Sequence, residues 1–250
     1  MQPTLQWQAG KVTAIRTETP QTKSFTLVLP LWMPHQPGQH YDVRLTAPDG
    51  YQTERSYSVA SEPERRGEIE LTVERIADGE VSPYLHDVIV PGDLLEVRGP
   101  VGGYFVWNVA LGGPLMLIGG GSGVVPLMAM LRHRLAHKST VPTHLLYSSR
   151  TLEDVIYKDE LDKLSRNDST LDIVFTFTRQ APAGWSGFQR RIDAAMLSDV
   201  TTPLGAGVRA YVCGPTLLVE AVANALVRMG LPTEKIRTER FGPTGNERGG

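Results

Sequence analysis

Arg55-Ser56-Tyr57-Ser58-Val59-Ala60-Ser61 is the stretch of the chain that says most about its fold. If it forms a β-strand, alternate side chains share one face, so Arg55 and Tyr57 point one way and Ser56 and Ser58 the other. One short strand then presents a cation, a flat aromatic ring and hydroxyl groups at fixed spacing.

Those groups suit a flavin nucleotide. The cation can pair with a diphosphate, the ring can cover an isoalloxazine, and a hydroxyl can reach the reactive N5. The same pattern also occurs in an ordinary polar strand that contains one tyrosine, because short motifs match by chance. The surrounding sequence therefore has to decide between these interpretations.

The region around this segment, residues 1–108, is rich in short strand patterns. They are bounded by Pro and Gly and alternate apolar with polar residues. About six such strands with little helix predict a small antiparallel barrel or sandwich. The expected strands are residues 12–16, 24–29, 40–45, 55–61, 68–75 and 94–98.

One helix is expected in this region, over residues 81–88, with Ser82 as its N-cap and Pro83 at its first position. Amides at a helix N-terminus bind phosphate well. The segment Gly79-Glu80-Val81-Ser82 is therefore either a second clamp on a diphosphate or the start of a plain surface helix.

From residue 112 onward, buried strands alternate with helices. Leu115-Met116-Leu117-Ile118 is a continuous apolar run, typical of a parallel strand covered on both faces. The pattern predicts a doubly wound parallel α/β domain over residues 112–250, after a first domain over 1–108. Strands are expected at 115–118, 145–147, 173–177, 210–212 and 236–241, and helices at 124–137, 155–164 and 217–229.

A glycine loop, Gly119-Gly120-Gly121-Ser122-Gly123, follows the first of these strands. Glycines let a backbone approach a pyrophosphate, and the next helix directs its positive end toward it. The loop lacks the Gly-x-Gly-x-x-Gly spacing of a Rossmann fingerprint and the Lys of a Walker loop. A tight strand-to-helix turn without a ligand stays open as an alternative.

Together and in this order, the motifs resemble the ferredoxin–NADP reductase family, over about residues 10–241. The flavin motif is Arg55-x-Tyr57-Ser58-x-x-Ser61, and the second phosphate motif is Gly79-x-Val81-Ser82. The turn that closes the barrel, the nucleotide loop and the segment beside the nicotinamide match Gly99-Pro100-x-Gly102, Gly119-Gly120-Gly121-Ser122-Gly123-x-x-Pro126 and Cys213-Gly214-Pro215.

The resemblance implies a role for each matching residue. Arg55 would pair with the flavin diphosphate, Tyr57 would stack on the isoalloxazine and Ser58 would hydrogen-bond N5. An Arg contact to a diphosphate favours FAD over FMN. Further flavin contacts would come from the backbone of Val73 to Arg75 and from Gly79, Val81 and Ser82. Nicotinamide nucleotide contacts would come from Gly120, Gly121, Ser122, Gly123, Cys213, Gly214 and Pro215.

Ser149-Arg150 ends the second strand of the nucleotide domain, where the adenosine ribose is expected. An Arg there can pair with a 2′-phosphate, whereas NAD-binding proteins tend to carry an acidic residue. Arg179 is a candidate second contact, and Asp154 argues the other way. We expect NADPH, with NADH as the alternative.

The end of the chain departs from the plant-type members of the family, which finish on an aromatic residue over the flavin. Here Glu239-Arg240-Phe241 is followed by a polar extension. Phe241 is a candidate cover for the ring and Glu239 a candidate proton relay. Residues 246–250 are expected to be disordered.

Composition narrows the choice of partners. The formal net charge of -2 gives no general attraction to nucleic acid. The one cysteine, Cys213, cannot supply the four thiolates of a cysteine-ligated [2Fe–2S] cluster. His133 and His137 stand one helical turn apart without a carboxylate between them, which favours a polar helix face over a metal site.

The N-terminus lacks a basic start and an apolar run, so no secretory signal is expected. No segment is long and apolar enough for membrane insertion. We expect a cytoplasmic monomer.

The predicted activity is hydride transfer from NADPH or NADH to FAD, then single-electron transfer to a separate protein such as a ferredoxin, a flavodoxin or an oxygenase component. Because the chain has no cluster of its own, it resembles a stand-alone reductase. Arg65-Arg66 and Arg190-Arg191 are candidate contacts for an acidic partner. The alternatives are a flavin or quinone reductase with a diffusible acceptor, and a nucleotide-sensing subunit without turnover.

Overall fold

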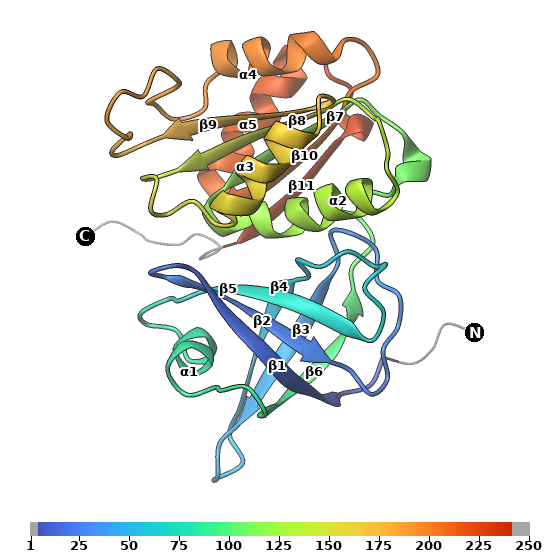
Figure 1. The fold of residues 1–250 in the computed structure, drawn as a ribbon, viewed down its shortest axis with the longest axis vertical. Coiled ribbons are helices and arrows are strands. Elements are labelled where there is room, and N and C mark those ends of the chain that lie inside the picture. Colours follow the sequence, from blue (N-terminus) through green and yellow to red (C-terminus); the bar gives the residue numbers. More distant parts are fainter. Residues whose placement is uncertain (1–4, 242–250) are drawn as a thin grey trace. The chain divides into compact units, whose positions relative to one another are not determined.

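The structure, a computed structural model, describes residues 5–241 (Figure 1). They form two compact units. The first runs to Leu111 and includes Met128–Ser139, and the second comprises Gly112–Leu127 and the chain from Thr140 onward. The expectations for the extension after Phe241 lie outside the described residues.

Within the described residues, the first unit contains six strands that pair only in antiparallel fashion, as the sequence predicts. Their order in the sheet is β4-β3-β6-β1-β2-β5. The strands are β1 (Gln8–Thr19), β2 (Thr22–Val28), β3 (His40–Thr46), β4 (Gln52–Ser58), β5 (Glu68–Glu74) and β6 (Leu94–Val101).

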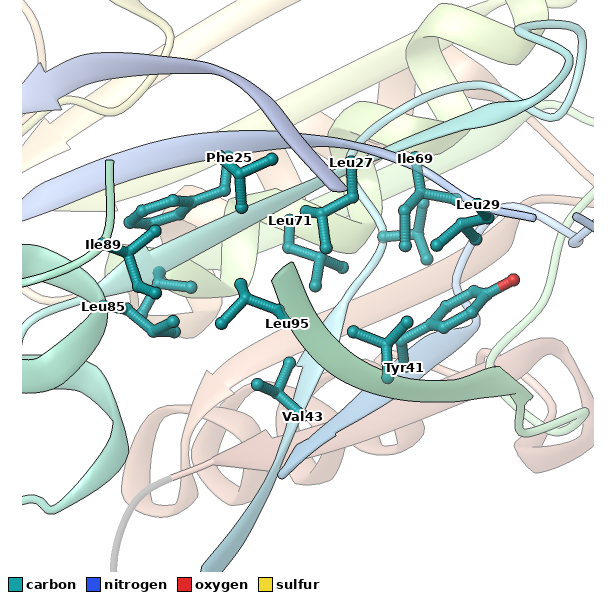
Figure 2. Close-up of a cluster of buried hydrophobic side chains, with 14 of the residues drawn as sticks. Phe25, Leu27, Leu29, Tyr41, Val43, Ile69, Leu71, Leu85, Ile89 and Leu95 are labelled. Atoms are coloured by element: carbon teal, nitrogen blue, oxygen red, sulfur yellow. The ribbon is translucent and has the colours of Figure 1, made fainter. Parts of the chain in front are cut away.

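The two outer strands of this sheet meet and close it into a barrel. Val59, just past β4, forms an antiparallel bridge with Leu71 of β5. Inward-facing side chains fill the interior, and Figure 2 shows them pointing toward one another from β2, β3, β5 and β6. Leu85 and Ile89, in and after the helix α1 (Val81–Asp87), complete this core.

The start of α1 differs from the sequence-based prediction. The N-cap is Glu80, and its side chain makes no capping hydrogen bond. Ser82 lies within the helix, where its hydroxyl accepts the backbone N–H of Ile76 at 3.0 Å. Ser82 therefore fixes the approach to the helix and does not cap it.

The second unit alternates strands and helices. Its sheet is parallel throughout, with the order β11-β10-β7-β8-β9. The strands are β7 (Leu115–Gly120), β8 (Thr143–Ser149), β9 (Leu171–Phe177), β10 (Arg209–Pro215) and β11 (Ile236–Phe241). The helices are α2 (Val124–Ala136), α3 (Lys158–Asn167), α4 (Ala194–Thr201) and α5 (Thr216–Arg228), and α2 is divided between the two units after Leu127. Short 3-10 turns lie at Val109–Leu111, Gly121–Gly123, Thr202–Leu204 and Thr233–Lys235.

This strand order confirms the doubly wound arrangement. The chain starts in the middle of the sheet at β7, builds outward through β8 and β9, and then returns to add β10 and β11 on the other side of β7. Met116 and Ile118 pack into a core with residues of α4 and α5. Leu115 and Leu117 point to the opposite face and are also fully buried. The switch in strand order lies between β7 and β10, where such folds bind ligands at the carboxyl ends of the strands.

Two helices differ from the sequence-based prediction. The helix expected over residues 155–164 begins only at Lys158, because Tyr157 adopts a left-handed conformation with φ of 60°. The helix α4 was not predicted from the sequence; its N-cap Asp193 accepts the amide of Met196. Among the described helices, none is long and apolar enough to cross a membrane.

Candidate functional site

Strand β4 places Arg55 and Tyr57 on one face of the barrel sheet. Their partners across the ladder are Val43 and Tyr41 of β3, and residues directly opposite in an antiparallel pair share a face. Tyr57 is partly buried against the barrel core, whereas Arg55 is exposed. Burial raises the pKa of Tyr57 to about 12, so its phenol is neutral at physiological pH. The pair offers a neutral aromatic surface beside an exposed cation.

The guanidinium of Arg55 is not committed to any acidic side chain within residues 5–241. Its hydrogen bond goes to the carbonyl of Glu54 at 2.7 Å. Two arginines on the next two strands of the sheet, β3 and β6, are ion-paired instead, Arg44 with Glu96 at 2.9 Å and Arg98 with Asp42 at 2.8 Å. Because a guanidinium pairs well with phosphate oxygens, Arg55 fits a diphosphate.

The three serines of this motif have different surroundings. Ser56 donates to Asp42 at 2.7 Å, so its hydroxyl belongs to the polar outer face of the sheet. Ser61 is fully buried, and its hydroxyl accepts the amide of Glu70 at 3.0 Å. Ser58 is partly exposed, and its hydroxyl makes no hydrogen bond in the described part of the chain. Ser58 is thus the hydroxyl of the motif that remains available to a ligand.

The start of α1 lies beside the same strand. The carboxylate of Glu80 accepts the hydroxyl of Tyr51 at 3.1 Å and that of Thr53 at 3.0 Å. The amides of Val81 and Ser82 belong to the first helical turn, where the helix itself supplies no acceptor. The structure therefore brings both predicted phosphate motifs to one side of the first unit.

No role was predicted for Glu80, although it lies within the motif Gly79-x-Val81-Ser82. Its contacts come from Tyr51 and Thr53, which the β3–β4 hairpin brings near. No local sequence signal marks such contacts.

The end of β5 is only partly available to a ligand. The carbonyl of Val73 accepts a hydrogen bond from the His86 ring at 2.9 Å, and the amide of Arg75 donates to Gln21 at 2.7 Å. The Arg75 side chain is ion-paired with Asp87 at 2.8 Å. Two backbone groups that the sequence assigned to a flavin edge are thus already in use within the barrel.

In the second unit, the glycine loop and the Cys213-Gly214-Pro215 segment lie side by side at the carboxyl ends of β7 and β10. A Cβ on Gly123 would fall 2.1 Å from the carbonyl oxygen of Cys213. Gly121 has φ of +55°, a conformation that few other residues adopt. Ser122 lies between them in the 3-10 turn. Packing against the neighbouring strand therefore explains Gly123, and backbone conformation explains Gly121.

The loops after β8 and β9 meet in the same unit. The amides of Arg179 and Gln180 donate to the carbonyl of Arg150 at 3.0 Å and 3.1 Å. Arg150 and Arg179 are both exposed, and neither makes an ion pair with any carboxylate among the described residues. Ser149 is buried and donates its hydroxyl to the carbonyl of Thr151 at 3.0 Å, and Asp154 accepts the Thr151 hydroxyl. Two uncommitted cations thus lie where the ribose was expected.

Cys213 and Glu239 are direct partners across β10 and β11. Burial, followed by the charge of Glu239, raises the pKa of the Cys213 thiol, so the thiol stays neutral. Burial also raises the pKa of Glu239 to about 7. A carboxyl with this pKa gains and loses a proton near neutral pH. Phe241, the last described residue, is partly buried opposite Pro215.

The basic pairs proposed as docking contacts are partly neutralised. Arg65 pairs with Glu68 at 2.8 Å, and Arg190 pairs with Asp193 at 2.6 Å. Arg66 and Arg191 remain exposed. Each pair therefore offers one cation to a partner.

Two family models match the chain. Residues 9–106 match an oxidoreductase FAD-binding domain, and residues 117–224 match an oxidoreductase NAD-binding domain. The two matches fall on the barrel strands and on the parallel sheet.

Two curated proteins and one solved structure illustrate the similarity. The glycine betaine monooxygenase reductase subunit of Chromohalobacter salexigens is 34% identical over 211 residues, covering 84% of this chain and 56% of that protein. Ferredoxin–NADP reductase B of Sorangium cellulosum is 31% identical over 209 residues, covering 82% of this chain and 84% of that protein. The FAD/NAD-binding domain of a nitric oxide dioxygenase from Vibrio cholerae has the same fold, with a TM-score of 0.84 at 24% identity, covering 94% and 99% of the two chains.

Proposed function

Because this chain belongs to the ferredoxin–NADP reductase family of FAD- and NAD-binding oxidoreductases, we propose that it oxidises NADPH and passes single electrons to a separate redox protein. The acceptor would be a ferredoxin, a flavodoxin or an oxygenase component. The relatives support this, since one is a monooxygenase reductase subunit and another a ferredoxin–NADP reductase. This chain spans little more than half of the monooxygenase reductase subunit, 56% of its length.

The observation that carries the proposal is the set of uncommitted groups on β4. Arg55 would hold the diphosphate of FAD, Tyr57 would lie against the isoalloxazine, and Ser58 would donate a hydrogen bond to N5. The bound cofactors would supply the redox chemistry, namely hydride transfer from nicotinamide to flavin and single-electron release to the acceptor. The chain's own groups bind and orient the reactants, and the hydride step needs no general acid.

The start of α1 would supply the second contact to the diphosphate. The amides of Val81 and Ser82 point out of the first turn, and a helix N-terminus favours an anion. Gly79 precedes that turn, with its amide bound to the carbonyl of Ile76 at 3.0 Å. The remaining backbone groups between Val73 and Arg75 would edge the flavin ring.

The carboxyl ends of β7 and β10 would hold the pyrophosphate and the nicotinamide. Gly120 ends β7, Gly121 to Gly123 form the turn that follows it, and Cys213 to Pro215 end the neighbouring strand. The buried neutral thiol of Cys213 would be a small, weakly polar neighbour of the nicotinamide and not a nucleophile. Glu239 would exchange protons with solvent near the site, and Phe241 would cover the flavin.

Arg150 and Arg179 would distinguish NADPH from NADH. Their side chains are exposed and free of carboxylate partners in the described structure, and they lie in the loops that follow β8, which ends at Ser149, and β9. A guanidinium pairs with a 2′-phosphate through charge-assisted hydrogen bonds, which NADH cannot make. We infer a preference for NADPH on this ground.

We also propose that the domains comprise residues 1–108 and 112–250 and that the protein acts as a cytoplasmic monomer. The division runs close to the structural boundary after Leu111, although the second half of α2 groups with the first unit.

An anaerobic NADPH titration tests the function. The FAD-loaded protein should lose its flavin absorbance on addition of NADPH and regain it when ferredoxin or flavodoxin is added. Fast turnover with free flavin or quinones and none with protein acceptors would instead establish a reductase of diffusible acceptors. Bound FAD that NADPH fails to reduce would establish a sensing subunit, and failure to bind FAD at all would overturn the assignment.

A further inference from the structure

A carboxylate and two imidazoles meet in the first unit, apart from the groups assigned above. Glu64 lies in the loop between β4 and β5, and His133 and His137 stand one turn apart at the end of α2. One ligand atom from each of the three side chains lies within 4.8 Å of the others. The sequence lacks a carboxylate between the two histidines, but folding supplies one from a position 69 residues earlier than His133.

The distances suit a small divalent ion. Nδ1 of His133 lies 2.9 Å from Oε1 of Glu64, and Nδ1 of His137 lies 3.5 Å from the same oxygen. In a tetrahedral zinc site with bonds of about 2.0–2.1 Å, neighbouring ligand atoms are about 3.4 Å apart. The observed separations fall on either side of that value. An ion can therefore be accommodated by small side-chain rotations.

One side chain of the cluster is held by packing, and the other two are accessible to solvent. The His133 side chain is buried, and its ring packs edge-on against Trp107 with centroids 6.0 Å apart. The side chains of Glu64 and His137 are 35% and 41% exposed, so solvent reaches the cluster. A site with three protein ligands keeps a position open for water.

In the metal-free state, the hydrogen bonds of His133 indicate which of its ring nitrogens carries the proton. The amide of Val109 donates to Nε2 of His133 at 3.3 Å, so the proton of this neutral ring sits on Nδ1 and is donated to Glu64. Metal binding at Nδ1 requires that proton to move to Nε2, which breaks the Val109 hydrogen bond. The Val109 bond is long, so its loss is a modest cost, and the Val109 amide becomes a reporter of binding. Nδ1 of His137 donates to the carbonyl of His133 at 3.1 Å in the metal-free state, so metal binding at that atom displaces this hydrogen bond as well.

We propose that Glu64, His133 and His137 bind a divalent first-row transition metal of the zinc class, with water in the remaining position. Two imidazoles and one carboxylate match the ligand preference of these metals and not that of magnesium or calcium, which take mainly oxygen ligands. The bound ion would join the β4–β5 loop to the end of α2. It would therefore stabilise the first unit by favouring the folded state.

Zinc titration of the chelator-treated full chain, followed by calorimetry, tests this. We expect one zinc ion per chain and a rise in melting temperature with zinc. E64Q and H137A should each weaken binding about tenfold or more, since even loss of a supporting group has that effect. The matched control E62Q removes a charge two residues away and should bind like the wild type.

Cobalt and NMR measurements separate this site from adventitious binding. Cobalt should give visible absorption bands in the wild type and E62Q, and these should be lost in H137A. On zinc addition, the Val109 amide resonance should shift in the proteins whose site is intact, namely the wild type and E62Q. Equal zinc affinity in all four proteins, or no binding by the wild type, would overturn the proposal.

Discussion

The two nucleotide-binding motifs of this chain differ in how far contacts within the fold itself already require their residues. On β4, the side chains of Arg55 and Ser58 make no hydrogen bond or ion pair to other residues in 5–241, apart from one hydrogen bond from Arg55 to a neighbouring carbonyl. At the end of β7, Gly123 is required by the backbone of Cys213, 2.1 Å from where a Cβ would lie. The side chains of the first motif therefore point to a ligand more strongly than the glycines of the second.

This difference has a general physical reason. A glycine can be required by a ligand or by a neighbouring strand, and sequence does not separate the two causes. An exposed cation without a carboxylate partner gains little from the fold itself. The following substitutions test the contrast, beginning with the largest expected effect.

G123A should destabilise the second unit by about 3 kcal/mol, because the new methyl group meets backbone that has little room to shift. Urea unfolding of the apoprotein measures this. G121A is the matched control, since a Cβ there meets nothing within 4 Å and only the left-handed conformation costs about 1 kcal/mol. Equal losses would show that packing on Cys213 does not explain the glycine.

R55A should weaken FAD binding about 10- to 100-fold, because hydrogen bonds to charged groups contribute about 1.5–3 kcal/mol each. Unfolding of the apoprotein should be unchanged. R44A removes an arginine that is paired with Glu96 on the neighbouring strand and should retain FAD. Wild-type flavin content in R55A would refute the diphosphate contact.

R150A should raise the KM for NADPH about tenfold and leave that for NADH nearly unchanged, since the loss of one exposed charge-assisted hydrogen bond costs about 1.5 kcal/mol. Steady-state kinetics with both nucleotides measure the ratio. R191A, which removes another exposed arginine of the same unit, is the control. Equal effects on the two nucleotides would argue against a 2′-phosphate contact.

S58A should slow flavin reduction by NADPH about fivefold, as expected for one neutral hydrogen bond of about 1 kcal/mol. The stability of the apoprotein should not change, because the Ser58 hydroxyl has no partner within the described residues. S56A should show the opposite behaviour, since Ser56 donates to Asp42 at 2.7 Å. Stopped-flow reduction and urea unfolding should be measured on both variants. Slower reduction in S56A together with lower stability in S58A would show that the two roles are exchanged.

E239Q should change the pH dependence of stability. Burial raises the pKa of Glu239 to about 7, above its ordinary value of 4.5. Between these pH values the folded protein holds a proton that the unfolded chain releases, so the Glu239 contribution to stability falls as pH rises. The variant should therefore gain stability relative to the wild type from pH 5 to pH 8. A constant difference over this range would show that Glu239 titrates normally.

Local patterns predicted most of the elements. Most of the described strands carry apolar residues at a clear spacing, and many have Gly or Pro near their ends, whereas β4 was predicted from its polar motif around Tyr57. The helix α4 was missed because it is only eight residues long, although its capping residue Asp193 was a usable signal. The start of α3 was misplaced because buried Val155, Ile156 and Tyr157 resemble helical positions although they precede the helix.

The sequence by itself determined the two classes of fold, their order in the chain and the family. The reason is that the periodicity of apolar residues and the order of the motifs are local properties of the sequence. Tertiary structure decided which residues already take part in hydrogen bonds or packing contacts within the protein. It assigned Ser56 and Ser61 to the barrel, left Ser58 available, placed Gly123 against Cys213 and brought Glu64 to His133. These contacts join residues that are distant in sequence, and only the packing of the chain fixes such distances.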